Sequence, residues 1–414
     1  GGEGGEDGAA GKGGATPGKG VSKPAVTMQY DDQKRVAKQG KAGKGMGVIK
    51  SASTRSVDLF SHLPQYDRHA LQESLMKVGV SSTAIHPAVS QLAVAFVDGS
   101  VSGSNARCVA TLNAFREVIQ DYTTPANKTM SRDLSARINS MIAFLVDCRP
   151  LSVTMGNAIK YLKQHIISLD PGSSEHENKR VLLAAIDSFI QEKIVFADET
   201  IVEQALMKIQ DGDKLLVYAY SHVVAKSILH ARSKGVHFRV VVVDSHPLSE
   251  SKISLRQYLQ AGISCTYCHI NSVSYIIRDV TKVFLGAASV LSNGTVIARV
   301  GTAAVAMVAK AFNVPVMILC ETYKFHERVQ LDSITFNELG DPEELVTVDG
   351  CPEVKSLEGW QDVPNLHLLN LRYDAMPADY VTMIITEIGM VPPTSVPVIL
   401  REYRTHKGGP GIFI

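Results

Sequence analysis

The chain has almost no net charge, because 42 lysine and arginine residues are balanced by 41 aspartate and glutamate residues to leave a formal charge of +1. Such a balance does not draw the whole molecule toward nucleic acid, so we expect nucleic acid not to be a partner. Long apolar runs are also lacking, since charged residues interrupt each one well before the ~18 residues that cross a bilayer. We therefore predict no membrane span.

Paired cysteine motifs and a recognisable signal peptide are lacking as well. Cys265 and Cys268 have the inner spacing of a zinc knuckle, but no second pair follows, and a strand would turn them to opposite faces. We expect no metal site, reduced thiols and a cytoplasmic location. The six cysteines lie scattered, mostly inside apolar stretches: Cys108, Cys148, Cys265, Cys268, Cys320 and Cys351.

Residues 1–57 have little that could form a core, because glycine, alanine, serine and lysine dominate them. We predict a disordered tail that begins inside a longer one, since the first residue is not Met. Its lysines are interpreted as a solvated linker. Weak contact with RNA or with an acidic protein surface, independent of sequence, is the alternative.

Residues 58–198 show the apolar spacing of amphipathic helices and no strand pattern. They predict a helical bundle domain. The expected helices are 105–120, 134–146, 152–167 and 179–195.

Residues 199–414 alternate between short apolar runs and amphipathic segments. This order predicts a Rossmann-like, doubly wound parallel sheet with helices on both faces, so the fold class is α/β. No cofactor is expected, because Tyr220-Ser221-His222 occupies the turn where a dinucleotide needs glycines. The expected strands are 215–220, 239–243, 264–268, 283–285 and 314–319, and the expected helices are 223–234, 251–261 and 302–312.

Residues 282–326 read as a strand, a hairpin turn at Asn293-Gly294, a crossover helix and the next strand. Backbone N–H groups at Gly301 and Thr302 would point out of the helix N-terminus, with Arg299 just upstream, and this arrangement suits a phosphate. Residues 285–289 nevertheless offer no carboxylate, thiol or imidazole.

The run from Leu285 to Thr302 resembles a superfamily that joins methylthioribose-phosphate and ribose-bisphosphate isomerases to the regulatory subunits of eukaryotic translation initiation factor two-B. Its enzymes carry an Asp in a Gly-Ala-Asp-Arg segment and a Cys in a Cys-Asn-Ala-Gly turn. The resemblance puts Ala288 at the place of the Asp, and Ala219 or Tyr220 at the place of the Cys. Alanine cannot transfer a proton, so we expect no catalytic residue.

Further segments, among them 101–108, 148–152, 320–325 and 385–392, narrow the resemblance to the delta members of the regulatory group. The resemblance runs from about Leu59 to the C-terminus. It implies a non-catalytic regulatory and scaffold subunit of the guanine-nucleotide exchange factor for initiation factor two. The implied partners are the alpha, beta, gamma and epsilon subunits, with beta the nearest, and initiation factor two with its phosphorylated alpha subunit. The alternative is a sugar-phosphate isomerase-like enzyme, or a protein that binds a sugar phosphate or nucleotide.

The resemblance also implies roles for single residues. An Arg-Pro pair like Arg149-Pro150 lies beside the substrate in the enzymes, so Arg149, Arg299, Gly301 and Thr302 would still hold an anion. The alternative is retained scaffold, with Arg149 in a buried ion pair. Leu63, Leu369 and Leu371 are expected to line a small-molecule pocket where the two halves of the complex meet, with simple core packing as the alternative.

A sensor for the phosphorylated partner is expected on the helical domain, in residues 123–137 and 192–203. Its mixed charge suits a protein loop, and by resemblance this face borders the cleft that takes the phosphorylated partner. Solvated helix charge is the alternative for each residue. The charged residues are Lys128, Arg132, Arg137 and Lys193, beside Asp133 and Glu199.

Overall fold

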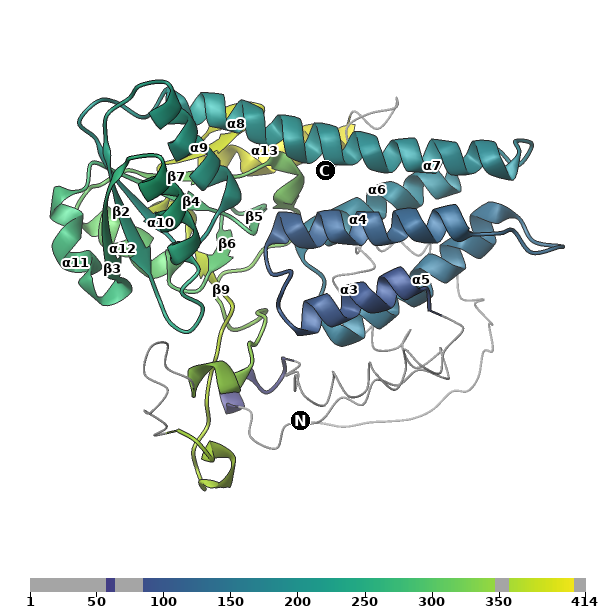
Figure 1. Ribbon diagram of the computed structural model, residues 1–414, viewed down its shortest axis with the longest axis horizontal. Helices are drawn as coiled ribbons and strands as arrows, with labels where there is room; N and C mark the ends of the chain where they lie inside the picture. The colour runs from purple at the N-terminus through teal and green to yellow at the C-terminus, as the bar shows by residue number, and fades with distance from the viewer. Residues whose placement is uncertain (1–56, 64–84, 347–356, 406–414) are drawn as a thin grey trace, which may run out of the picture.

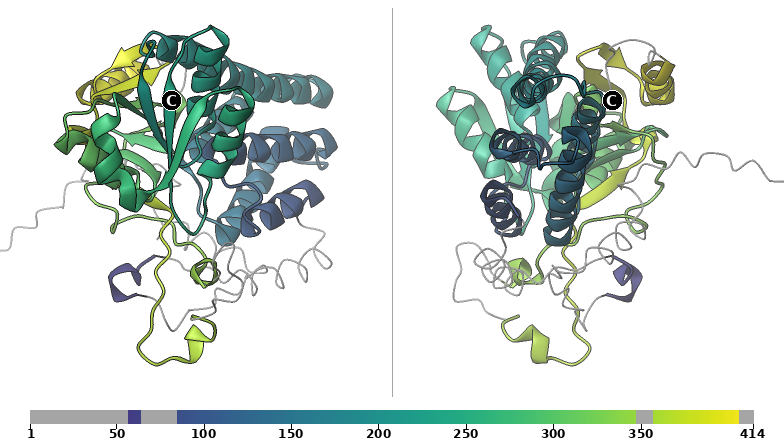
Figure 2. Two further views of the ribbon diagram at one scale, coloured as in Figure 1. Left: turned by 60° about the vertical axis from the view of Figure 1, so that its left-hand side comes forward. Right: turned by 90° about the vertical axis from the view of Figure 1, so that its right-hand side faces the viewer.

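The computed structural model describes residues 57–63, 85–346 and 357–405. Nearly all of the predicted tail, residues 1–56, lies outside the described residues. The described chain forms a helical domain beside an α/β domain (Figure 1). In Figure 2 the blue helices of the first lie next to the green sheet layers of the second.

Between residues 85 and 190 the structure describes five α-helices, three of which begin at a capping residue in the sequence. Ser152 and Ser174 accept hydrogen bonds from backbone N–H groups three residues ahead, and His86 caps a helix that starts at a proline. The expected helices are confirmed, with shifted ends. They are α3 (Pro87–Val97), α4 (Ser104–Asp121), α5 (Met130–Cys148), α6 (Val153–Ile167) and α7 (Glu175–Ile190).

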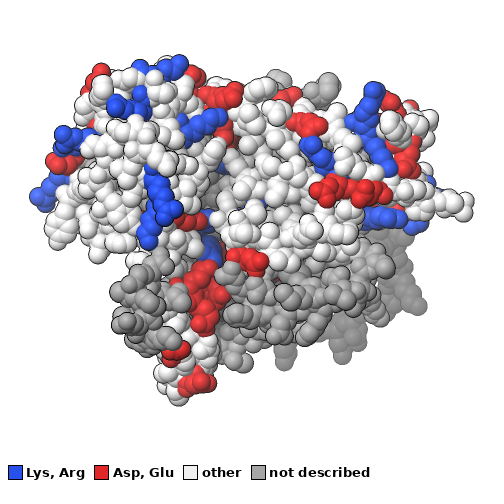
Figure 3. Space-filling view, viewed as in Figure 1, with Lys and Arg blue, Asp and Glu red and all other residues white. Residues whose placement is uncertain are grey.

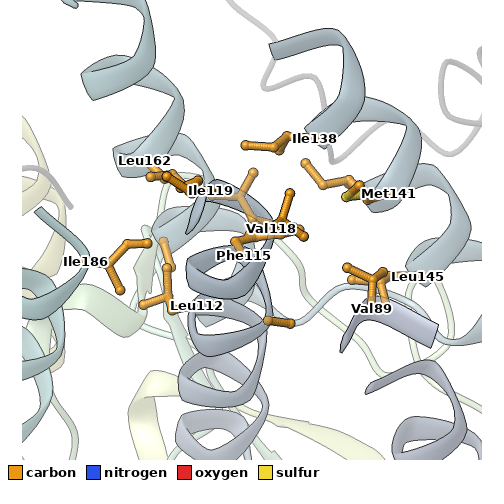
Figure 4. Close-up of a cluster of buried hydrophobic side chains, with 14 of the residues drawn as sticks. Val89, Leu112, Phe115, Val118, Ile119, Ile138, Met141, Leu145, Leu162 and Ile186 are labelled. Atoms are coloured by element: carbon orange, nitrogen blue, oxygen red, sulfur yellow. The ribbon is translucent and has the colours of Figure 1, made fainter. Parts of the chain in front are cut away.

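The core of this domain forms where the apolar faces of the helices meet (Figure 4). Phe115 and Ile119 on α4 are fully buried, as are Ile138 and Leu145 on α5. These positions follow the three- and four-residue spacing of a helix face, which is why periodicity alone identified them.

The two domains are joined by a continuous helix and not by a linker. After α7 the helix passes through a π-helical turn, η2 (Gln191–Val195), into α8 (Phe196–Leu206). Ile201 and Ala205 of α8 are buried in the core of the α/β domain. The predicted boundary between residues 198 and 199 therefore falls inside α8 (Figure 1).

The α/β domain is built on a seven-stranded sheet with the order β11-β10-β7-β4-β1-β2-β3. The pairings are parallel, as predicted, except for β11, which runs antiparallel at one edge. The strands are β1 (Lys214–Tyr218), β2 (Arg239–Asp244), β3 (Ser264–His269), β4 (Lys282–Gly286), β7 (Val316–Leu319), β10 (Met383–Thr386) and β11 (Gly389–Val391).

Alternate residues of each strand pack on opposite faces of this sheet. Leu215 and Val217 join the core under one set of helices, whereas Leu216 and Tyr218 join the core on the other face. The first set is α8, α9 (His222–Ser233) and α10 (Ser251–Gln260). The second is α11 (Val273–Ile276), α12 (Thr302–Ala311) and α13 (Val396–Thr405).

A second sheet, which the sequence did not predict, has the order β8-β5-β6-β9. The hairpin at Asn293-Gly294 is confirmed and belongs to this sheet, so the chain leaves the large sheet after β4 and only then enters α12. Gly294 has a φ of +79°, which favours glycine. The strands are β5 (Ser289–Leu291), β6 (Val296–Arg299), β8 (Phe325–His326) and β9 (Tyr373–Met376).

Buried polar contacts fasten the helical domain to the α/β domain. Glu338 lies 2.6 Å from Arg149 Nε and 3.5 Å from a nitrogen of Arg107, and all three side chains are largely buried. Burial raises the pKa of Glu338, but the two arginines outweigh burial and hold it below its usual value. Asn157 on α6 donates a hydrogen bond of 2.8 Å to the carbonyl of Tyr323.

We expect Glu338→Gln to lower the free energy of unfolding by roughly 3–5 kcal/mol, because it leaves buried arginine charge uncompensated. Denaturant unfolding of the purified chain measures this change. Glu117→Gln is the control, since Glu117 is exposed on α4, and it should change stability by no more than ~0.5 kcal/mol. Equal stability of the two variants would contradict the structural role given to Glu338.

Candidate functional site

A cleft of about 620 Å³ opens at the carboxyl ends of β1 and β4. The sheet order reverses between these two strands, and ligand sites of doubly wound folds lie at such a point. One wall comes from the helical domain through residues 102–106, and the other from the turns after β1 and β4. The volume lies within the range of small-molecule sites.

The residues that the resemblance sets at the places of the enzymes' Cys and Asp, Ala219 or Tyr220 and Ala288, all line this cleft. Ala219 follows β1 and Ala288 follows β4, and both line the same cavity. Ala219 has a φ of +53°, an uncommon backbone conformation for a residue with a side chain. The turn thus has a strained backbone of the kind found at active sites, although the side chain of Ala219 is only a methyl group.

The turns after β1 and β4 touch closely because Gly286 has no side chain. A Cβ atom at Gly286 would lie 2.3 Å from Ser221 Oγ. This contact brings the segments of Ala219 and Ala288 together.

Arg299, a predicted anion ligand, lines the cleft, but a carboxylate already neutralises it. Its Nε and a terminal nitrogen donate hydrogen bonds to Glu250 of 3.0 and 2.8 Å. The guanidinium also lies over the ring of Tyr373, 5.5 Å from the centroid. A two-pronged ion pair of this kind occupies the donors that a phosphate would need.

Gly301 and Thr302 begin α12 as predicted, and the helix N-terminus is filled from within the chain. One oxygen of Asp374 accepts hydrogen bonds from the N–H groups of Gly301 at 2.7 Å and Ala303 at 3.0 Å. Burial raises the pKa of Asp374 to about 7, although these two hydrogen bonds act to lower it. Thr302 turns its hydroxyl to the carbonyl of Arg299.

Arg149 does not join Arg299 and Thr302 in the lining of the cleft. Besides its ion pair with Glu338, it donates a hydrogen bond of 3.4 Å to the carbonyl of Val101. It lines a separate cavity of about 80 Å³, together with Glu338 and Arg372. This geometry is the buried ion pair that was the alternative for Arg149.

Lys324 is a cleft residue that the sequence reasoning missed. It is buried, and its Nζ lies 2.6 Å from Glu321 Oε2. The spacing Glu321-x-x-Lys324 directly after the apolar strand β7 was the available signal. Among the described residues that line the cleft, both permanent cations, Arg299 and Lys324, are paired with buried or half-buried carboxylates.

The predicted sensor residues at the start of α5 differ in their pairing. Lys128 and Arg137 both contact Asp133, at 2.8 and 2.9 Å. The hydrogen bond from Lys128, with those from Tyr122 and Arg137, holds the pKa of Asp133 below its usual value against the effect of burial. Arg132 is exposed, and no ion-pair partner is found for it among the described residues.

Lys193 does not share that surface, so this part of the predicted sensor was wrong. Glu175, at the start of α7, accepts a hydrogen bond from Thr124 N at 2.9 Å, next to the sensor loop. Lys193 lies 18 residues further along the same helix, ~27 Å away at 1.5 Å per residue. There it faces Glu387 of the α/β domain.

The three leucines predicted at a subunit interface occupy different environments. Leu369 is 37% exposed, Leu371 is half-buried beside Leu339, and Leu63 is buried. The segment of Leu63 is held to the α/β domain by His62, which hydrogen-bonds to the carbonyl of Ile334 at 2.9 Å.

On the face seen in Figure 3, charged side chains of both signs are interspersed over the two domains, and acidic side chains gather on the segment below the α/β domain. None of the helices in the described ranges has the length and apolar character needed to cross a membrane.

Comparison with known proteins relates the chain to both regulatory subunits and enzymes. It is 45% identical over 384 residues to translation initiation factor eIF2B subunit delta of Dictyostelium discoideum, which takes in 91% of this chain and 61% of that protein. It is 30% identical over 304 residues to ribose 1,5-bisphosphate isomerase of Pyrococcus furiosus, which takes in 73% of this chain and 89% of that enzyme. The chain thus spans about 61% of the length of the Dictyostelium protein.

The fold also matches a solved structure. A chain in the crystal structure of the tetrameric eIF2B-beta2-delta2 complex from C. thermophilum superposes with a TM-score of 0.71 at 32% identity, covering 82% of this chain and all of that one. Residues 100–393 match the family model described as the initiation factor 2 subunit family. Because this match takes in the greater part of both domains, the chain belongs to the initiation factor 2 subunit family.

Proposed function

We propose that the chain is a non-catalytic regulatory and scaffold subunit of the guanine-nucleotide exchange factor for translation initiation factor two, acting in the cytoplasm. The observation that carries this proposal is the composition of the cleft. By the resemblance, Ala288 and either Ala219 or Tyr220 stand where the enzymes carry ionisable residues, and the two permanent cations of the lining are held by internal carboxylates. Isomerisation of a sugar phosphate needs a positioned acid and base as well as a place for phosphate.

The alternative is an isomerase-like enzyme or a sugar-phosphate or nucleotide-binding protein, and the cleft of about 620 Å³ favours it. His222 is the remaining imidazole in the cleft lining. Burial lowers its pKa, and its Nε2 lies 3.9 Å from Asp198. Glu250 and Lys324 also line the cleft, but both are held in ion pairs, which supports the regulatory proposal over the enzymatic one.

The proposed partners are the other subunits of the exchange factor. Pairing with the beta subunit is supported by the beta2-delta2 complex in the comparison structure and by the exposed Leu369. The alpha, gamma and epsilon subunits, and factor two itself, follow from the likeness to a delta subunit.

Recognition of the phosphorylated alpha subunit of factor two is proposed for the start of α5, and Arg132 is its central residue. A cation in the first turn of a helix is unfavourable next to the helix dipole, and Arg132 has no compensating carboxylate among the described residues. An unpaired arginine at a helix N-terminus suits an incoming phosphate. Lys128 and Arg137 support the site by fixing Asp133.

The first test of the proposed function is turnover. The purified chain should not convert ribose 1,5-bisphosphate above the background rate, because no acid/base pair faces the cleft. The Pyrococcus isomerase, assayed in parallel, is the positive control. Conversion that depends on enzyme concentration would establish the enzymatic alternative instead.

Assembly should depend on Leu369. Replacing it with Asp puts a charge into a contact that would otherwise bury a leucine, so the subunit dissociation constant should rise by roughly tenfold or more. Sedimentation of the co-expressed complex at low protein concentration measures this effect. Leu259→Asp is the control, because Leu259 is exposed on α10, far from the 363–371 segment (Figure 1). Equal assembly of both variants rejects the interface role.

Regulation should depend on Arg132. Arg132→Glu should weaken inhibition by the phosphorylated factor roughly tenfold, the scale of one charge-assisted contact of ~1.4 kcal/mol. Nucleotide exchange on the unphosphorylated factor should stay nearly unchanged. Lys310→Glu carries the same charge change on exposed α12 and should leave inhibition intact. Intact inhibition with a collapse of basal exchange in Arg132→Glu would make this surface structural.

A further inference from the structure

Two buried carboxyl groups act on each other where α8 packs on the α/β domain. Asp198 lies on α8 and Glu321 follows β7, and their exposed fractions are 4% and 0%. Asp198 Oδ1 has no hydrogen-bond partner among the described residues. Glu321 Oε2 has its ion pair with Lys324 and no hydrogen bond of normal geometry. Each carboxyl group therefore has an oxygen left without a hydrogen bond.

The surrounding charges do not compensate two ionised carboxylates. Lys324 is the buried cation of the cluster, and Asn105 on α4 donates a hydrogen bond of 2.5 Å to Glu321 Oε1. The other groups that face the pair add little positive charge inside. They are His222 and Lys226 on α9, and Glu387 after β10, which adds a further carboxyl group and accepts from Thr322.

One proton between the two groups resolves both unsatisfied oxygens. A neutral Asp198 can donate a hydrogen bond to Glu321, which stays ionised beside Lys324. Burial, then repulsion by Glu321, raises the pKa of Asp198 to about 8. Burial also acts to raise the pKa of Glu321, but Lys324 and the hydrogen bonds from Asn105 and Asp198 bring it below its usual value.

The pair lies close to the point where the continuous helix joins the two domains. Asp198 comes three residues after the π-helical turn Gln191–Val195, and α8 continues through that turn into α7. Turns of this kind interrupt the regular hydrogen bonding of a helix and often mark functional sites. Asn105 belongs to α4, so the cluster ties the helical domain, the bridging helix and the large sheet at one point.

We propose that Asp198 and Glu321 share one proton and form a latch that holds α8 on the α/β domain, and that loss of this proton to solvent releases the latch. With both groups ionised, repulsion inside a buried cluster opposes docking of α8. The latch would set how firmly the helical domain, which carries the start of α5 at its far end, is held to the sheet.

The pH dependence follows from proton linkage. An undocked, solvated Asp198 has the ordinary pKa of ~3.9, whereas the docked residue has a pKa of about 8. Between these values, undocking releases one proton, so the undocking constant should rise up to about tenfold for each pH unit. Docking of α8 is therefore strongest at acidic pH, weakens through neutrality and levels off above pH ~8.

Hydrogen exchange of the full chain between pH 6 and 8 tests the proposal. After correction for the intrinsic exchange rate, the protection of α8 amides near Ile201 should fall with pH in the native sequence. Asp198→Asn keeps a donor toward Glu321 but cannot ionise. The slope of the logarithm of its protection factor against pH should therefore be smaller than the native slope by nearly one proton. Glu199→Gln, which changes the exposed neighbour on α8, should keep the native slope.

Equal slopes for the native chain and Asp198→Asn would overturn the latch. A second measurement applies even if that variant folds poorly. A protonated carboxyl group has an infrared carbonyl band that a carboxylate lacks, so Glu321→Gln, which removes the repelling charge but keeps a carbonyl acceptor, should change the pH at which the Asp198 band disappears. Asp374 is intact in that variant and cancels in the difference spectrum. Glu387, whose pKa Glu321 also acts to raise, is separated by repeating the comparison in a Glu387→Gln background. An unchanged band would overturn proton sharing.

Discussion

The ion pairs of Glu338 with Arg107 and Arg149 hold the helical domain at the mouth of the large sheet, and the cleft depends on them. Residues 102–106 form a wall of the cleft only while α4 stays at the carboxyl ends of β1 and β4. Removing one partner from a buried ion pair costs far more than losing an exposed one, so these contacts restrict the relative position of the domains. The continuous helix from α7 to α8 adds a second constraint on the same joint.

The cleft has the volume and position of an enzyme site, but its charged groups are paired with other groups of the same chain. Glu250 binds Arg299 through both oxygens, and Asp374 accepts the N–H groups at the start of α12. A phosphate would have to displace a carboxylate at each place, and a buried carboxylate without its donors is costly. The same contacts that pair the charges of the site also link β9 to α12, so they stabilise the scaffold around the cleft.

When the interior charges are paired, the groups available to partners are those on the surface. Arg132 has no described ion-pair partner, whereas its neighbours Lys128 and Arg137 are held by Asp133. Lys128 and Arg137 therefore hold Asp133 in place and are less available to bind a partner. Among the three predicted interface leucines, Leu369 is the one exposed to a partner, because Leu63 and Leu371 are more buried. In these proposals, regulation uses Arg132 on the helical domain, and assembly uses Leu369 on the α/β domain.

Periodicity in the sequence alone determined the helices of the first domain, the parallel strands of the second and the hairpin at Asn293-Gly294, because these depend on neighbours a few residues apart. The resemblance that sets Ala288, and Ala219 or Tyr220, at the places of the enzymes' ionisable residues also came from the sequence. Tertiary structure alone decided that Asp374 fills the N-terminus of α12, 73 residues from Gly301, and that Glu250 neutralises Arg299. It also decided that Lys193 lies far from the sensor loop, and that β5, β6, β8 and β9 form a second sheet. Such pairings depend on how the chain brings distant segments together, and strands of two to four residues are too short to carry a periodic signal.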